Sequence, residues 1–127
     1  MAQDRAMVTV YAYAKCDTCR RALQFLRERR ILFREVPIRT TPPTLPELKA
    51  MLTARGDIHK LFNTAGADYR ALGLSGKLSK LSQPEALGLL AKNGNLVKRP
   101  FLSGDGVNLV GFNEKEWQAA FGWGTPE

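Results

Sequence analysis

Hydrophobic and polar positions along the chain change their spacing several times, and each spacing predicts one element of secondary structure. Residues 8–13 form a run of β-branched and aromatic side chains, which predicts a buried first strand. Apolar positions within residues 19–26 recur at the helical spacing, and Asp17 or Thr18 is the expected N-cap of that helix. Residues 31–38 return to a strand pattern. A strand, a helix and a strand within about 30 residues are typical of a βαβ unit, so these two strands should be parallel.

Between residues 44 and 92 the chain carries helix and turn signals instead of strand patterns. Thr44 is followed three residues later by Glu47, which is the spacing of a capping box. A second helix start follows at Ser82, with proline and glutamate in its first turn. Because no flexible linker separates this block from its surroundings, we interpret it as a helical insertion within a single domain that spans residues 1–127.

The C-terminal part of the chain predicts two further strands. Residues 95–98 and 101–102 are expected to form strand segments on either side of Arg99–Pro100. Residues 103–106 have the composition of a hairpin turn, so the following strand, at 107–112, should return antiparallel.

Asn113 is the expected cap of a final helix, and residues 122–127 are expected to be a frayed tail from which Trp123 packs back. The predicted order is therefore β-α-β, a helical block, and β-β-α. Two such halves that share one mixed sheet form the thioredoxin arrangement. The predicted fold is α/β, a thioredoxin-like mixed sheet with an inserted helical subdomain.

The composition is that of a globular protein, with 44% hydrophobic and 24% charged residues in 127. No apolar run approaches the roughly 18 residues that span a bilayer, so we expect no membrane segment. Residues 1–6 lack the apolar core of a signal peptide, and we expect a cytoplasmic protein.

A net charge of +7 makes nucleic acid, an acidic protein or an anionic substrate conceivable partners, although a solvated basic surface is the simplest interpretation. Basic residues are densest between Arg20 and Arg34. They lack the interleaved aromatic residues of a single-strand binding groove, and no helix-turn-helix or finger motif is present. We therefore expect no direct sequence-specific binding of nucleic acid.

The two cysteines of the chain, Cys16 and Cys19, lie where the first strand passes into the first helix. They could be ordinary small hydrophobic residues, but the helix N-terminus and the neighbouring Lys15 and Arg20 would stabilise a thiolate at Cys16. Residues three apart on a helix have Cα atoms about 5 Å apart, which is within disulfide range. Cys16 could therefore attack a substrate, and Cys19 could resolve the adduct by forming an internal disulfide.

A zinc site is the main chemical alternative to a redox pair. Structural zinc needs four ligands, and the chain offers two cysteines and one histidine, His59. We interpret His59 as a surface residue and expect no metal and no bound cofactor.

Arg99–Pro100 is the second chemically informative pair. A proline inside a strand pattern indicates an edge, a bulge or a cis peptide bond. In a thioredoxin-type layout this position lies beside the Cys-x-x-Cys loop. A cis-proline there would leave backbone groups free to bind an extended substrate, and Arg99 would reach the same pocket. The alternative is a surface arginine that precedes a structural proline.

Several motifs together resemble the arsenate reductase/Spx family, in the order in which that family carries them. They are Cys16-Asp17-Thr18-Cys19-Arg20, Phe62-Asn63-Thr64-Ala65-Gly66 with Tyr69-Arg70, Lys98-Arg99-Pro100 and Val110-Gly111-Phe112. The resemblance implies a thioredoxin-like fold with a helical subdomain and a catalytic role for Cys16.

The same resemblance implies two different activities. In arsenate reductases linked to glutaredoxin, serine usually stands at the position of Cys19, glutathione resolves, and arginines at positions such as Arg20 and Arg99 hold the oxyanion. Spx proteins instead bind the RNA polymerase α subunit and use their Cys-x-x-Cys pair as a redox switch. Cys19, together with Ala65 where a further arginine or polar group would be expected, favours internal disulfide chemistry.

The sequence thus predicts a thiol-disulfide oxidoreductase of the arsenate reductase-like type, or alternatively a redox-sensing regulator. The expected catalytic residues are Cys16, Cys19 and Arg99, and the expected substrate-binding residues are Lys15, Thr18, Arg20 and Pro100. We expect a monomer that reduces a small oxyanion or a disulfide, with glutathione and glutaredoxin, or thioredoxin, as reductant.

Overall fold

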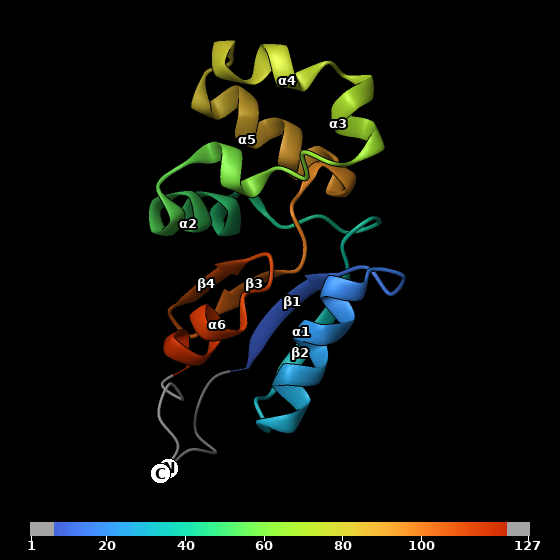
Figure 1. Cartoon of the computed structure of the whole chain (residues 1–127). Coiled ribbons are helices and arrows are strands. Elements are labelled where there is room, and N and C mark those ends of the chain that lie inside the picture. Colours follow the sequence, from blue (N-terminus) through green and yellow to red (C-terminus); the bar gives the residue numbers. More distant parts are fainter. Residues whose placement is uncertain (1–6, 122–127) are drawn as a thin grey trace.

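A four-stranded mixed sheet, in the order β2-β1-β3-β4, forms one half of the molecule (Figure 1). The computed structural model describes residues 7–121. β1 (Val8–Ala12) pairs in parallel with β2 (Phe33–Pro37), and β3 (Phe101–Gly104) pairs antiparallel with both β1 and β4 (Val107–Val110). This topology confirms the predicted thioredoxin-like mixed sheet.

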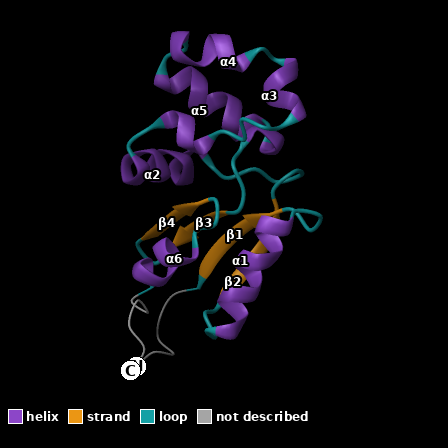
Figure 2. Ribbon diagram, in the orientation of Figure 1, coloured by secondary structure: helices purple, strands orange, loops and turns teal. Residues whose placement is uncertain are grey.

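The helices follow the predicted order around this sheet. Their bounds are α1 Asp17–Glu28, α2 Leu45–Arg55, η2 Ile58–Leu61, α3 Ala67–Ala71, α4 Leu74–Lys77, η3 Leu78–Lys80, α5 Gln83–Lys92, η4 Gly94–Leu96 and α6 Glu114–Ala120. Figure 2 shows that the helical elements between β2 and β3 gather beyond one end of the sheet. That residues 1–127 form one domain with an insertion at about 44–92 stays a prediction.

Alternation along β1 divides the hydrophobic core into two clusters. Val8, Val10 and Ala12 pack with α1 and with Trp117 of α6 on one face of the sheet. Tyr11, on the opposite face, packs with apolar residues of the helices between β2 and β3. The end of β1 therefore meets both clusters, and the loop that follows it carries the cysteine pair.

Two helices of the segment between β2 and β3 start where the sequence signals predict. Thr44 and Ser82 each form the complete capping box that their spacing predicts. The helix α2 ends at Gly56, whose φ of +80° suits the left-handed conformation that glycine adopts without steric cost.

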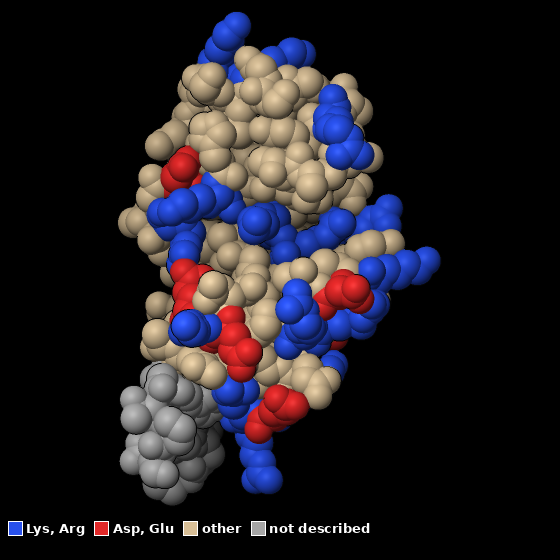
Figure 3. Space-filling view, viewed as in Figure 1, with Lys and Arg blue, Asp and Glu red and all other residues tan. Residues whose placement is uncertain are grey.

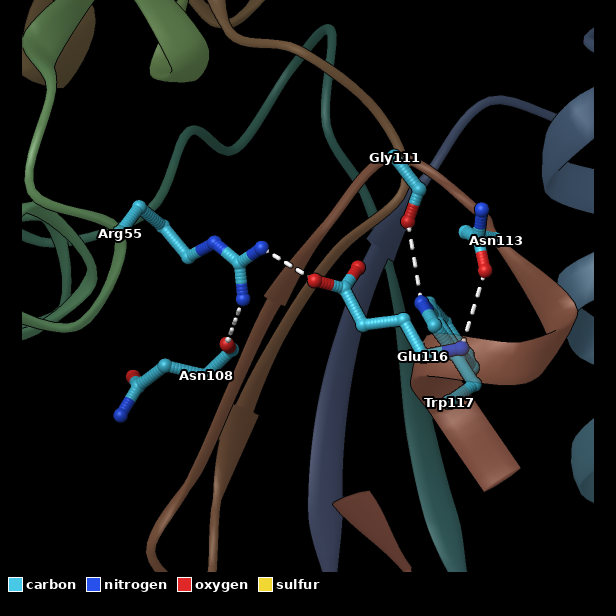
Figure 4. A network of polar contacts seen from close by, with 6 residues as sticks. All are labelled: Arg55, Asn108, Gly111, Asn113, Glu116 and Trp117. Atoms are coloured by element: carbon cyan, nitrogen blue, oxygen red, sulfur yellow. Dashed lines mark hydrogen bonds and ion pairs between the residues drawn. The ribbon is translucent and has the colours of Figure 1, made fainter. Parts of the chain in front are cut away.

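Polar contacts join this helical segment to the C-terminal helix (Figure 4). Arg55, at the end of α2, forms an ion pair with Glu116 of α6 and donates a 3.5 Å hydrogen bond to the backbone carbonyl of Asn108. Trp117, the next residue of α6, donates from its ring nitrogen to the carbonyl of Gly111 at 3.1 Å. The Arg55 side chain thus links the helical segment to α6 and β4.

The prediction of a strand at residues 95–98 was wrong. Residues Gly94–Leu96 form the 3-10 helix η4 because the Asn93 side chain accepts a hydrogen bond from a backbone N–H two residues ahead. Val97 forms only an isolated antiparallel bridge with Phe62.

The last strand is also shorter than predicted, because β4 ends at Val110 and Gly111, with φ of +71°, turns the chain away from the ladder. Asn113 caps α6 as expected, through a 2.9 Å hydrogen bond from the backbone N–H of Glu116. The predicted frayed tail and the packing of Trp123 lie outside the described residues.

Candidate active site

Cys16 is the N-cap of α1, so the prediction that Asp17 or Thr18 caps this helix was wrong. Its backbone is extended, with φ −99° and ψ 119°, and its carbonyl accepts the first helical hydrogen bond from the Arg20 N–H at 3.0 Å. Its Sγ accepts a hydrogen bond from the backbone N–H of Cys19, with 3.4 Å between the sulfur and the nitrogen. A thiol thus occupies the place of the usual oxygen acceptor at a helix N-terminus.

The pKa of the Cys16 thiol is lowered from its ordinary value. Partial burial acts against this shift and raises the pKa, but hydrogen bonds from Cys19 and from the Thr18 backbone, together with the positive charge of Arg99, outweigh it. The thiolate, which is the reactive form, is therefore favoured at this position.

Cys19 lies one turn along α1 and has no exposed surface. Burial is the main cause that raises the pKa of its thiol. A hydrogen bond with the Tyr13 backbone lowers this pKa, the hydrogen bond and charge of Cys16 raise it, and the charge of Arg99 lowers it slightly, so the net shift is upward. Both cysteines are free thiols. The pKa values of the two thiols are therefore shifted in opposite directions, downward for Cys16 and upward for the buried Cys19.

The Arg99–Pro100 peptide bond is cis, which is one of the three alternatives that the sequence left open, and Arg99 lies close enough to Cys16 to lower its pKa. The backbone N–H and C=O of Arg99 make no hydrogen bond with residues 7–121. That these groups bind an extended substrate stays a prediction.

A pocket of about 450 Å³ opens at the Cys16 sulfur. Its polar lining comes from four different segments and consists of Cys16, Thr18, Asn63, Lys98, Arg99 and Asn113. Gly111 forms part of the wall, and a Cβ at this position would lie 2.9 Å from the Cε of Lys98. The glycine therefore leaves room for the lysine side chain at the edge of the pocket.

The structure brings only part of the predicted substrate-binding set to this pocket. Thr18 lines it, whereas Arg20 forms an ion pair with Asp17, donates a 2.9 Å hydrogen bond to the Ala14 carbonyl, and lines a separate hollow on the α1 side. Lys15 is exposed and lines neither the Cys16 pocket nor this hollow. Pro100 is buried. Binding of substrate by these residues stays a prediction.

Sequence reasoning assigned no site role to Tyr13 or Arg39. The Arg99 guanidinium lies 5.1 Å from the centre of the Tyr13 ring, and that of Arg39 lies 4.7 Å from it. Tyr13 stands three residues before Cys16, which was the one sequence signal available for it. Three further residues of the pocket had a sequence signal, because they belong to motifs that carried the family resemblance. They are Asn63, Lys98 and Gly111.

A metal centre finds no support in the part of the chain that the structure describes. Residues 7–121 contain no group of three or more histidine, cysteine, aspartate or glutamate side chains placed to hold an ion. His59 is exposed, as expected, and its Nδ1 lies 3.0 Å from a carboxylate oxygen of Asp57.

Positive charge gathers where the helical segment meets the sheet. Figure 3 shows a band of lysine and arginine side chains across this level of the molecule. The loop between η4 and β3, which carries Lys98 and Arg99, crosses at the same level. Such a field attracts anionic substrates or acidic partner surfaces.

None of the helices in residues 7–121 is long and apolar enough to cross a membrane.

A Cys-x-x-Cys pair at the start of the first helix, close to a cis-proline loop, places this α/β protein in the thioredoxin-like class. Within that class, the model of the ArsC family matches residues 11–120. The chain belongs to the ArsC family.

Individual relatives agree with this membership. The chain is 44% identical to YusI, an uncharacterised protein of Bacillus subtilis, over 113 residues that cover 87% of this chain and 95% of YusI. It is 32% identical to the global transcriptional regulator Spx of Enterococcus faecalis, over 87% of this chain and 83% of Spx. The crystal structure of a possible arsenate reductase from Streptococcus mutans superposes with a TM-score of 0.81 at 39% identity, covering 89% of this chain and 98% of that one.

Proposed function

We propose that the protein is a cytoplasmic, thiol-dependent oxidoreductase in which Cys16 is the nucleophile and Cys19 the resolving thiol. The observation that carries this proposal is the Cys16 sulfur at the helix N-cap, with Arg99 alongside it and Cys19 one turn away. The lowered pKa of Cys16 supports attack at neutral pH. Once Cys16 is covalently bound its negative charge disappears, which removes one of the causes that raise the pKa of Cys19.

For a disulfide substrate, the Cys16 thiolate attacks one sulfur, forms a mixed disulfide, and the other substrate sulfur leaves as a thiolate. The Cys19 thiolate then attacks Cys16 Sγ, forms the Cys16–Cys19 disulfide and releases the second substrate thiolate. The substrate gains two electrons, and the two protein thiols lose them. Glutathione with glutaredoxin, or thioredoxin, would return the protein to its dithiol form.

For an arsenate-like oxyanion, the Cys16 thiolate would form a sulfur–arsenic bond while an arsenic-bound hydroxyl leaves as water. Attack of Cys19 on Cys16 Sγ would break that bond and leave its electron pair on arsenic, reducing As(V) to As(III). Arg99, and Lys98 at the pocket edge, are suited to an anion. The likeness to the Streptococcus mutans protein described as a possible arsenate reductase supports this substrate class.

A redox-sensing transcriptional regulator is the second candidate. The 32% identity to Spx of Enterococcus faecalis supports it, and the same cysteine pair would serve as its switch. In that case the partner would be the RNA polymerase α subunit, and the basic band would contribute to the interface. Both candidates use the same dithiol, so the cysteines alone do not distinguish them. Only the enzyme would reduce a substrate in repeated cycles.

The test is a turnover assay of the wild type beside Cys16→Ser and Cys19→Ser. Arsenate or a glutathione mixed disulfide is supplied with glutathione and glutaredoxin, or with thioredoxin, as reductant. We expect turnover by the wild type and none by either variant. Retention of activity in Cys19→Ser with glutathione would mean that glutathione resolves instead. Absence of turnover in every combination, together with capture of purified RNA polymerase α subunit, would support the regulator.

A further inference from the structure

Tyr13 contacts two arginines that are 60 positions apart in the sequence. The Cζ of Arg39 lies 4.7 Å from the ring centre, and the Cζ of Arg99 lies 5.1 Å from it. Arg39 also donates a 2.7 Å hydrogen bond from Nη1 to the Tyr13 hydroxyl. The ring is thus held at its polar end by one arginine while the other rests against its π system.

Arg39 is itself anchored by the 3-10 helix η4. Its Nε donates to Oδ1 of Asn95 at 3.0 Å, and the backbone N–H of Asn95 donates to the Asn93 side chain at 2.9 Å. The Asn95 amide also reaches the carboxylate of Asp68 at 3.4 Å. A chain of polar contacts therefore runs from η4 through Arg39 to the Tyr13 ring.

Arg99 has no comparable polar anchor. Its side chain makes no hydrogen bond and no ion pair with residues 7–121, although the residue is half-buried at the Cys16 pocket. For a long side chain whose donors make no hydrogen bond, the free-energy cost of moving away is small unless packing holds it in place. The Tyr13 ring is the contact that supplies such packing.

We propose that Tyr13 and Arg39 are positioning residues that hold the Arg99 guanidinium beside the Cys16 sulfur. Arg39 fixes the ring through its hydroxyl, and the ring fixes Arg99, so that the Arg99 donors remain free for an anionic substrate. The proposal rests on the proposed function only in taking Cys16 as the reactive thiol.

The reactivity of Cys16 towards neutral iodoacetamide and anionic iodoacetate tests this proposal without any turnover. The ratio of the two rates reports the positive charge near the sulfur, and peptide mass spectrometry assigns the alkylation to Cys16. The decisive variant is Tyr13→Leu, which removes the ring and changes no charge. We expect the iodoacetate-to-iodoacetamide ratio to fall about threefold, in the same direction as in Arg99→Gln.

A double variant separates positioning from a general structural effect. In the Arg99→Gln background, Tyr13→Leu should cause no further fall in the ratio, because the ring acts through Arg99. Tyr13→Phe keeps the ring and should stay closer to the wild type than Tyr13→Leu. Arg39→Lys keeps the charge without the planar fork and should lower the ratio in part. It also carries the test if Tyr13→Leu does not fold.

Phe33→Leu is the matched control, because Phe33 lies under Arg27, with 5.7 Å between the guanidinium and the ring centre, at the other end of the β1–β2 pair. Its ratio should equal that of the wild type. A wild-type ratio in both Tyr13→Leu and Arg39→Lys would overturn the proposal, and so would an equal fall with and without Arg99. A protein that shows the expected ratios but no turnover would contradict the proposed enzyme and leave the positioning of Arg99 intact.

Discussion

The Cys16 sulfur accepts a hydrogen bond from the backbone N–H of Cys19, 3.4 Å away, across the first turn of α1. The proposed nucleophile is therefore also the cap of its own helix. Because helix N-termini stabilise negative charge, this contact favours the thiolate over the thiol, and Arg99 acts in the same direction. The reactivity of the site depends on a local backbone feature and on one residue brought in by tertiary structure.

The first expectation concerns the pH dependence of Cys16 alkylation. Only the thiolate reacts, so a lowered pKa shifts the rate profile to lower pH, and the wild type should react faster than free cysteine at pH 6–7. Arg99→Gln should raise the pKa and move the profile to higher pH, because it removes the positive charge beside the sulfur. Arg70→Gln is the control, because Arg70 is exposed in α3 and donates to the Ala65 carbonyl. Equal profiles for free cysteine and Cys16 would refute the lowered pKa.

Gly94 should tolerate no side chain. A Cβ there would lie 1.6 Å from the carbonyl oxygen of Ile38, a backbone atom that cannot move aside without shifting the exit of β2. We expect Gly94→Ala to lower the free energy of unfolding by at least about 2 kcal/mol in urea denaturation. The control is Gly88→Ala in α5, where nothing lies within 4 Å and helix propensity should stabilise by about 0.5–1 kcal/mol. Similar effects of the two substitutions would contradict the close approach.

The ion pair between Arg55 and Glu116 should contribute more to the stability of the fold than the other α6 ion pair, between Arg29 and Glu114. Arg55 is largely buried, and Glu116→Gln would leave its guanidinium without a carboxylate partner (Figure 4). We expect a loss of about 1 kcal/mol in the free energy of unfolding. Glu114→Gln breaks a longer 3.8 Å pair with Arg29, in which the glutamate is 62% exposed, and should change it by less than about 0.5 kcal/mol. The two arginines are similarly buried, so the expected difference comes from the closer contact and the lower exposure of Glu116. Equal losses of the two variants in thermal denaturation would contradict it.

Local signals in the sequence predicted most of the frame of the site. The change from strand to helix spacing located the cysteine pair, and the capping box at Thr44 located α2. The proline at position 100 interrupted a strand pattern, which gave the cis peptide bond as one of three possible explanations. These features succeed because each depends on residues close together in the chain.

The parts that failed depend on competition or on distant contacts. Cys16, and not Asp17, is the N-cap because its extended backbone directs the sulfur towards the Cys19 N–H. Residue preferences for the N-cap position alone do not predict this. The contact of Arg39 with Tyr13 joins residues 26 apart, and its contact with Asn95 joins residues 56 apart. Periodicity carries no information about which distant side chains meet, so this part of the site could be found only in the structure.

Trapping of the covalent intermediate tests the division of labour between Cys16 and Cys19 most directly. Each single serine variant is mixed with a glutathione mixed disulfide, and the intact protein is weighed by mass spectrometry without added reductant. Cys19→Ser should accumulate a stable glutathione adduct on Cys16, Cys16→Ser should accumulate none, and the wild type should end as the internal disulfide. An adduct on Cys16→Ser, or the absence of an adduct on Cys19→Ser, would contradict the assignment of Cys16 as nucleophile and Cys19 as resolving thiol.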